Sequence, residues 1–259
     1  MLITGMGPVG LGGIINAKDI GAKVIVTGHN DYRNDLAKKL AKEHSIKSPV
    51  DTGKFKKVII NRILNDIGFQ RIKLIGDSLV MPDNMSLDFN SLAQGFTVDL
   101  IGRYLETKNI HNFLIEVGGE ILAKGLNDDD KIWRIGIDKP LNNIDYNDRF
   151  QLILDLENKA LATSGNYRKF YIKNGLKYSH MINPFTGFPA QNNLLSVTVI
   201  HDDCIMADAY STAFMVMGVK EAKQFVLLNP EIETYLVYTD KDGNWKTYIS
   251  PRMLKRVVY

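Results

Sequence analysis

Apolar residues recur at helical spacing in four segments of the chain. Residues 56–67, 92–107, 206–217 and 222–229 place apolar side chains three and four positions apart, which brings them onto one face of a helix. Gly218 follows the third segment directly and is a typical residue at a helix end. In the segment 92–107, the stripe that we expect to be buried consists of Leu92, Phe96, Leu100, Ile101 and Tyr104.

Other segments alternate between apolar and polar residues and predict β-strands. Single strands are predicted over residues 111–117, 133–137, 150–156 and 194–200. Two hairpins are predicted, one over residues 71–82 around Gly76 and Asp77, the other over residues 235–249. Strands and helices are mixed without a regular βαβ rhythm, so the pattern predicts an α+β fold with antiparallel sheets and packed helices.

Residues 1–45 have a different pattern, which reads as strand, glycine-rich turn, helix, strand and helix. The run Gly5-Met6-Gly7-Pro8-Val9-Gly10 matches G-x-G-x-x-G, in which glycines let the backbone approach a pyrophosphate. Gly28 and His29 stand where an acidic residue is expected after the second strand. Residues 5–40 resemble the start of the nucleotide-binding domain of zinc-dependent medium-chain alcohol dehydrogenases, over a single βαβ unit.

We therefore predict three parts in the chain. Residues 1–45 are expected to be a Rossmann-like βαβ fragment that does not bind a dinucleotide, because such a site needs a completed parallel sheet. Residues 46–54 are polar, contain Pro49 and Gly53, and are expected to be a linker. Residues 55–259 are expected to form the functional domain. The alternative, an NAD-binding dehydrogenase remnant, stays open at this point.

Composition narrows the functional classes. The 259 residues are 45% hydrophobic and 24% charged, which is typical of a globular protein and excludes a disordered or collagen-like chain. Lys and Arg number 32 against 29 for Asp and Glu, and this excess is too small to indicate nucleic acid or a membrane surface as a partner. The start of the chain has no pattern of a signal peptide, so a cytoplasmic location is expected for the sequence as written.

A carboxylate and two hydroxyls share one face of the predicted helix at 206–217. Asp208, Ser211 and Thr212 stand at positions i, i+3 and i+4. These hard oxygen donors suit Mg²⁺. The alternative is a polar stripe near the start of a helix, where the helix dipole favours Asp208. The only cysteine, Cys204, is expected to be a small buried residue rather than a reactive thiol.

A second candidate region leads into the predicted helix at 92–107. Asp88 or Asn90 is favoured as the cap of this helix. Gly95 lies inside the helix, where glycine costs about 1 kcal/mol relative to alanine. We infer that a ligand or another backbone approaches closely at Gly95.

Two loops add further candidates. Residues 179–189 are rich in proline and glycine and predict a rigid irregular loop, in which His180 could transfer a proton or simply bind backbone groups. Glu116 and Glu120 flank a tight turn at Gly118 and Gly119 and are expected to be solvated. Motifs of serine hydrolases, P-loop NTPases, zinc peptidases and thiol oxidoreductases are missing from the sequence.

Taken together and in this order, six stretches resemble the FAD:protein FMN transferases, the flavin transferases of the ApbE type. The resemblance covers about residues 55–259 and rests on SLDFNSLAQGFTVDLIGRYL, NFLIEVGGEILAKG, WRIGIDKP, LATSGNYRKFY, YSHMINPFTGFPAQNNLLSVTVI and CIMADAYSTAFMVMG. It implies an α+β fold related to the tunnelling folds. It also implies Mg²⁺-dependent transfer of FMN from FAD to a threonine or serine hydroxyl of a target protein, with release of AMP. Alternatives are a FAD pyrophosphatase and a flavin-binding protein without transfer.

The resemblance also implies roles for individual residues. Asp208 and Thr212 correspond to Mg²⁺ ligands, Ser211 to a position that is acidic in some relatives, and the Ser91 carbonyl completes the metal site. His180 stands at the functional histidine of the family. The expected flavin-site residues are Asp88, Gln94, Ser164, Gly165 and Ile182. Family members carry an N-terminal segment with several FAD contacts, for which the dehydrogenase-like residues here offer no counterpart. They are usually exported and lipid-anchored, and a homodimer is one candidate assembly.

Overall fold

The computed structural model describes residues 2–4, 25–27, 60–61, 63–83, 85–139, 149–165, 170–173, 176–179 and 181–258. The chain divides into two compact units, each of which is described by itself. The first comprises residues 1–88 and 182–189, and the second comprises residues 89–181 and 190–259. Across the described residues, no helix is long and apolar enough to cross a membrane.

The first unit contains short strands and a loop. β1 (Leu2–Thr4) and β2 (Ile25–Thr27) pair in parallel, as expected for the two strands of a βαβ unit. A 3-10 helix, η1 (Phe69–Arg71), precedes an antiparallel hairpin of β3 (Lys73–Ile75) and β4 (Ser78–Val80). The predicted turn at Gly76 is therefore confirmed. The glycine motif between β1 and β2 lies outside the described residues.

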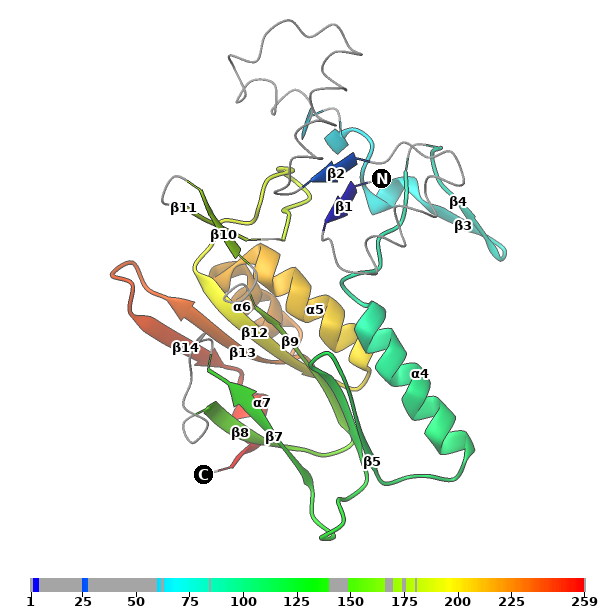
Figure 1. The fold of residues 1–259 in the computed structure, drawn as a ribbon, viewed down its shortest axis with the longest axis vertical. Coiled ribbons are helices and arrows are strands. Elements are labelled where there is room, and N and C mark those ends of the chain that lie inside the picture. The colour runs from blue at the N-terminus through cyan, green and yellow to red at the C-terminus, as the bar shows by residue number, and fades with distance from the viewer. Residues whose placement is uncertain are drawn as a thin grey trace, which may run out of the picture. The chain divides into compact units, whose positions relative to one another are not determined.

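The second unit is built on a six-stranded sheet in which every neighbouring pair is antiparallel (Figure 1). Its strands, in spatial order, are β14 (Trp245–Ile249), β13 (Glu233–Thr239), β12 (Leu194–His201), β9 (Lys159–Gly165), β6 (Glu120–Lys124) and β5 (Phe113–Val117). A second antiparallel sheet holds β15 (Val257–Val258), β8 (Phe150–Leu156) and β7 (Trp133–Asp138). A separate hairpin pairs β10 (Phe170–Lys173) with β11 (Leu176–Ser179). The α+β class with antiparallel sheets is thus confirmed.

Alternate residues of the large sheet pack into different cores. Val197 and Val199 of β12 join Leu236 in the core under the helices, whereas Ile200 and Tyr235 join the core shared with the small sheet. The helices on the first face are α4 (Ala93–Thr107), α5 (Cys204–Met217) and α6 (Val219–Leu228). The small sheet and α7 (Pro251–Leu254) cover the other face, which gives three layers (Figure 1).

The helices predicted at 92–107, 206–217 and 222–229 are present as α4, α5 and α6, and most predicted strands are present too. The helix predicted at 56–67 and the helices predicted within residues 1–45 lie partly or wholly outside the described residues. The prediction missed five strands, β6, β9, β10, β11 and β15, and the helix α7. In β9, Ala160, Leu161 and Ala162 are buried one after another. A strand covered on both faces loses the alternation on which strand prediction rests.

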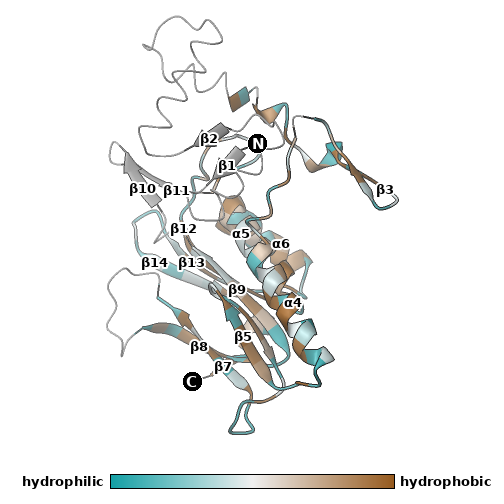
Figure 2. Cartoon of the chain, turned by 45° about the vertical axis from the view of Figure 1, so that its right-hand side comes forward, coloured by the Kyte–Doolittle hydropathy of each residue, from teal (hydrophilic) through white to brown (hydrophobic). Residues whose placement is uncertain are grey.

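The expected buried stripe of α4 is wrong. The helix buries Gly95, Val98, Asp99 and Gly102. Phe96 and Tyr104 of the expected stripe are 47% and 59% exposed, and Leu100 and Ile101 are exposed too. Figure 2 shows apolar and polar positions interleaved along α4. The packed face is the one with small residues, because a glycine lets the helix approach its neighbours more closely than a large side chain would.

The close approach that we inferred at Gly95 is confirmed, and its partner is another backbone. A Cβ atom built on Gly95 would lie 2.4 Å from the carbonyl oxygen of Cys204, the first residue of α5. The starts of α4 and α5 therefore touch at backbone distance. Neither Asp88 nor Asn90 is the N-cap of α4, because that position belongs to Leu92, which offers no side-chain cap.

Each of the two helices instead caps the other with a carboxylate. Asp99 of α4 accepts hydrogen bonds from the amides of Cys204 and Ile205, both at 2.9 Å. Asp208 of α5 accepts a hydrogen bond from the amide of Gly95 at 3.0 Å. These amides belong to the first turns of the helices, which have no acceptor within their own helix. The negative charges also lie at the positive ends of the helix dipoles.

Replacing Gly95 by alanine is expected to destabilise the protein. The added methyl group would meet the Cys204 carbonyl, and overpacking of this kind destabilises a protein by about 1–3 kcal/mol. The better helix propensity of alanine offsets up to about 1 kcal/mol of this loss. Urea unfolding should therefore show a lower midpoint for Gly95→Ala. Arg103→Ala, on the exposed side of the same helix, is the control, and an equal midpoint for both variants would contradict the close contact.

Replacing Asp99 by asparagine is expected to destabilise the protein by about 2 kcal/mol, because the side-chain amide offers one uncharged acceptor oxygen to two backbone donors, those of Cys204 and Ile205. Thermal unfolding measures the change. Asp242→Asn removes the same charge from the exposed turn between β13 and β14 and should leave the melting temperature within about 1 °C of the wild type. A similar effect of both substitutions would show that Asp99 contributes only its charge.

Candidate active site

The carboxylate of Asp208 is buried at the start of α4. Its residue is only 5% exposed, and its Oδ2 atom accepts the Gly95 hydrogen bond. Within the described part of the chain, Oδ1 accepts no hydrogen bond. Burial raises the pKa of the Asp208 carboxyl above its usual value, and the hydrogen bond from Gly95 opposes this rise. When Asp208 is ionised, a cation beside its carboxylate would therefore stabilise the buried negative charge.

Three hydroxyl groups meet one turn further along α5. Ser164, near the end of β9, lies with its Oγ atom 2.9 Å from Ser211 Oγ and 3.3 Å from Thr212 Oγ1. Ser211 Oγ also donates to the carbonyl of Asp208 at 2.9 Å. Ser211 is fully buried and engaged on two sides, whereas Thr212 is half-buried. We expected Ser164 to contact the flavin, and Ser211 and Thr212 to bind the metal. The structure places Ser164 within hydrogen-bond distance of both.

Ser91 and Gln94 lie at the same end of α4 that Asp208 caps. Ser91 directly precedes the N-cap residue Leu92 and is half-buried. In a continuing helix the Gly95 amide would bind the carbonyl of Ser91, four residues back, but here it binds Asp208 instead. Gln94 is exposed and extends to the β5–β6 turn, where a Cβ atom on Gly118 would lie 1.9 Å from its Nε2 atom.

The same turn corrects one expectation and confirms another. Glu120 follows the turn and is only 6% exposed, so the expectation that it is solvated is wrong, whereas Glu116 is exposed as expected. Glu120 opens β6, and its partner across the hairpin is Val117 of β5. Its Oε2 atom lies 3.5 Å from the Cβ position of Gly118. The turn, rather than solvent, therefore surrounds this carboxylate.

The remaining predicted site residues belong to other elements of the chain. Asp88 and Ile182 belong to the first unit, where Asp88 is exposed and Ile182 pairs with Pro189 across the loop. Gly165 ends β9 opposite Ser196 of β12. His180 lies outside the described residues.

Oxygen donors dominate the surroundings of Asp208. No group of three His, Cys, Asp or Glu side chains that could hold a metal ion occurs among the described residues. The available donors are one carboxylate, the hydroxyls of Thr212 and Ser164, and the carbonyl of Ser91. Mg²⁺ is commonly bound by one or two carboxylates, water and substrate phosphates rather than by a complete protein cage. This donor set fits such an ion.

Cys204 and Asp99 lie at the contact between the first turns of α4 and α5. Cys204 is fully buried, and burial raises the pKa of its thiol well above the usual range, so it is the inert residue that was expected. Asp99 was missed as a site-forming residue. It follows Gly95 by four positions and precedes Gly102 by three, so it shares their face. A charged residue between two helical glycines is the signal that could have identified it.

The comparisons agree with this fold. A family model described as "ApbE family" matches residues 31–236. The FAD:protein FMN transferase of Vibrio cholerae is 37% identical over 185 residues, which cover 71% of this chain and 54% of the relative. That of Escherichia coli K12 is 34% identical over 172 residues, covering 66% of this chain and 47% of the relative. The chain thus spans about half the length of these curated relatives.

Solved structures give the same result. The flavin transferase ApbE from Vibrio cholerae superposes with a TM-score of 0.66 at 34% identity, covering 76% of this chain and 61% of that one. The ApbE protein of Thermotoga maritima shares the fold with a TM-score of 0.67 at 22% identity and covers 90% of this chain and 80% of that one. With its matching segment, its antiparallel sheets and its relatives at more than 30% identity, this chain belongs to the ApbE family.

Proposed function

We propose that this chain acts in the Mg²⁺-dependent transfer of FMN from FAD to a threonine or serine hydroxyl of an acceptor protein, with release of AMP. Membership of the ApbE family and the names of its curated relatives support the reaction class. The observation that carries the proposal is the buried Asp208 carboxylate, one helical turn from Thr212, whose hydroxyl lies 3.3 Å from Ser164 Oγ.

In this proposal Asp208, Thr212 and the Ser91 carbonyl would hold Mg²⁺, and Ser211 would position the site through its hydrogen bonds to Ser164 and to the Asp208 backbone. The ion supplies positive charge to the phosphoryl oxygens of the FAD diphosphate. The Gly95 amide holds one carboxylate oxygen of Asp208 and leaves the other available.

The reaction exchanges one phosphorus–oxygen bond for another. The acceptor hydroxyl oxygen bonds to the phosphorus of the FMN half, the bond from that phosphorus to the bridging oxygen breaks, and AMP leaves with the bridging oxygen. The hydroxyl loses its proton, and we assign the imidazole of His180 as the group that accepts it. Phosphoryl transfer requires orientation and charge stabilisation more than covalent help from the enzyme. Asp88, Gln94, Ser164, Gly165 and Ile182 are proposed to orient the flavin substrate.

Asp208→Asn is expected to lower the rate of FMN transfer on the order of a hundredfold or more. Asparagine retains an acceptor for the Gly95 amide but removes the charge that holds the ion. The measurement is the mass gained by an acceptor domain after incubation with FAD and Mg²⁺. Asp242→Asn is the matched control with full activity. Free FMN and AMP without labelled acceptor would support the pyrophosphatase alternative, and undiminished transfer by Asp208→Asn would refute the assignment of Asp208.

The same substitution should not destabilise the metal-free protein at neutral pH. Because the folded-state pKa of Asp208 is raised, its ionisation opposes folding at pH values above that pKa, and the penalty disappears below the unfolded-state value of about 3.9. The melting temperature of the wild type relative to Asp208→Asn should therefore fall as the pH rises from 3.5 to 7. A wild type that gains stability over Asp208→Asn across this range would contradict the burial argument.

Thr212→Val is expected to raise the Mg²⁺ concentration for half-maximal activity about tenfold, since it removes one oxygen ligand at nearly constant volume. A Mg²⁺ titration of FMN transfer measures this shift. Thr97→Val, on the exposed side of α4, removes a hydroxyl that only binds the Ala93 carbonyl of its own helix, and its titration curve should match the wild type. Equal curves for Thr212→Val and the wild type would exclude Thr212 as a ligand.

A further inference from the structure

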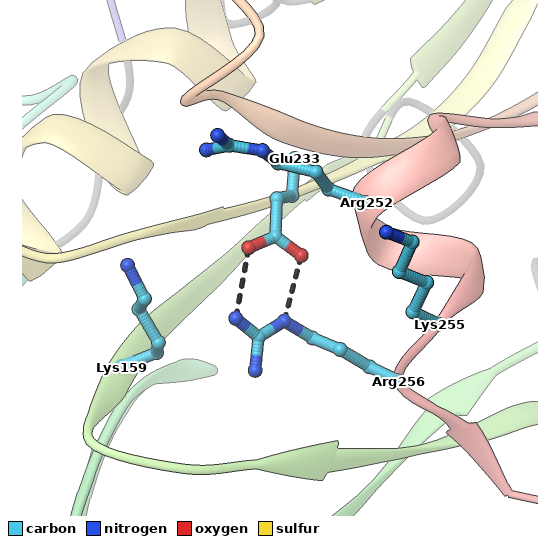
Figure 3. A pocket seen from close by; sticks show the side chains of 5 residues that line it. All are labelled: Lys159, Glu233, Arg252, Lys255 and Arg256. Atoms are coloured by element: carbon cyan, nitrogen blue, oxygen red, sulfur yellow. Dashed lines mark hydrogen bonds and ion pairs between the residues drawn. The ribbon is translucent and has the colours of Figure 1, made fainter.

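A cavity lined by charged side chains lies on the face of the large sheet opposite α4, α5 and α6. Its volume is about 360 Å³, and its lining consists of Lys159, Glu233, Arg252, Lys255 and Arg256 (Figure 3). These residues come from the starts of β9 and β13, from α7 and from the turn that follows α7. Four cations thus surround a single carboxylate.

The carboxylate is already neutralised within the lining. Glu233 is buried, and Arg256 donates to both of its oxygens, from Nε at 2.7 Å and from Nη2 at 2.9 Å (Figure 3). The hydrogen bond to Glu233 raises the pKa of the Arg256 guanidinium, so Arg256 stays positively charged. This two-pronged pair fixes the Arg256 side chain at the centre of the cavity.

The other three cations are not neutralised to the same degree. Lys159 pairs with Asp202, whose side chain is 74% exposed and therefore well screened by water. Arg252 and Lys255 form no ion pair with any described residue. Glu157 and Asp202 also act on Arg256 from outside the lining, and both are exposed. The cavity itself therefore carries an excess of positive charge.

This cavity is separate from the candidate active site. Lys159 begins β9 and Ser164 lies five residues further along, so their side chains point to opposite faces of the sheet and lie about 17 Å apart along the strand. Tyr235, which shares its face with Glu233, packs in the core under the small sheet. A ligand in the cavity would not contact Asp208 or Thr212.

We propose that this cavity binds a small polyphosphate anion, such as the diphosphate part of a soluble metabolite. Planar guanidinium groups match phosphate oxygens in pairs, and lysine ammonium groups add point charges. The volume falls at the lower end of the range for small-molecule sites, roughly 300–1,000 Å³, and leaves room for more than one phosphate. The bound anion would relieve the repulsion among Lys159, Arg252 and Lys255.

Calorimetry with inorganic pyrophosphate tests the proposal on the full chain, without divalent cations and at constant ionic strength. The double variant R252A/K255A removes two exposed cations from the cavity, and its affinity should be at least about tenfold weaker than that of the wild type. The double variant K220A/K241A removes the same charge from exposed positions on α6 and on the β13–β14 turn and should bind as the wild type does.

Three outcomes would overturn the proposal. The first is that the wild type does not bind pyrophosphate. The second is that both double variants weaken binding equally, and the third is that the wild type binds pyrophosphate, sulfate and chloride with equal affinity. The second and third outcomes would indicate only a general attraction of anions. Melting temperatures measured without ligand control for misfolding of either double variant. Tighter binding of pyrophosphate than of inorganic phosphate by the wild type would support a site for more than one phosphate.

Discussion

The second unit depends on the contact between the first turns of α4 and α5. Gly95 brings the two backbones together, and Asp99 and Asp208 then satisfy the amides that each helix leaves open at its start. Each carboxylate is buried, so each needs its hydrogen bonds to offset the loss of water. Neither helix can shift along the other without breaking bonds of both. This contact fixes the position of Asp208 relative to α4 and, one turn further along α5, the positions of Ser211 and Thr212.

This arrangement gives Asp208 a structural and a chemical task at once. One of its oxygens caps α4, and the other has no hydrogen-bond partner among the described residues. One turn further along α5, the hydroxyls of Ser211 and Thr212 meet the hydroxyl of Ser164 from β9. A cation held there would be fixed by the same contact that joins the helices. In the proposed reaction, the precision of the phosphoryl transfer therefore depends on helix packing beneath the site.

The large sheet separates two chemically different regions. The face under α4 and α5 carries the oxygen donors around Asp208, which suit a cation. The opposite face, beside α7, carries the guanidinium and ammonium groups around Glu233, which suit an anion. Because successive residues of a strand point to opposite faces, β9 contributes Ser164 to one region and Lys159 to the other. The proposed polyphosphate site is thus part of the same scaffold without sharing its reacting groups.

Local sequence patterns determined the helices α4, α5 and α6, most strands, the fold class and the shared face of Asp208, Ser211 and Thr212, because these follow from the periods of a helix and a strand. They also indicated the close contact at Gly95. The tertiary structure alone decided which face of α4 is buried, that Glu120 is enclosed, and that Ser164 meets Ser211. The physical reason is distance along the chain, since Gly95 and Asp208 are 113 residues apart and Ser164 and Ser211 are 47 apart. A periodic pattern shows that a helix has an apolar face, but only the packed partners show which face is covered.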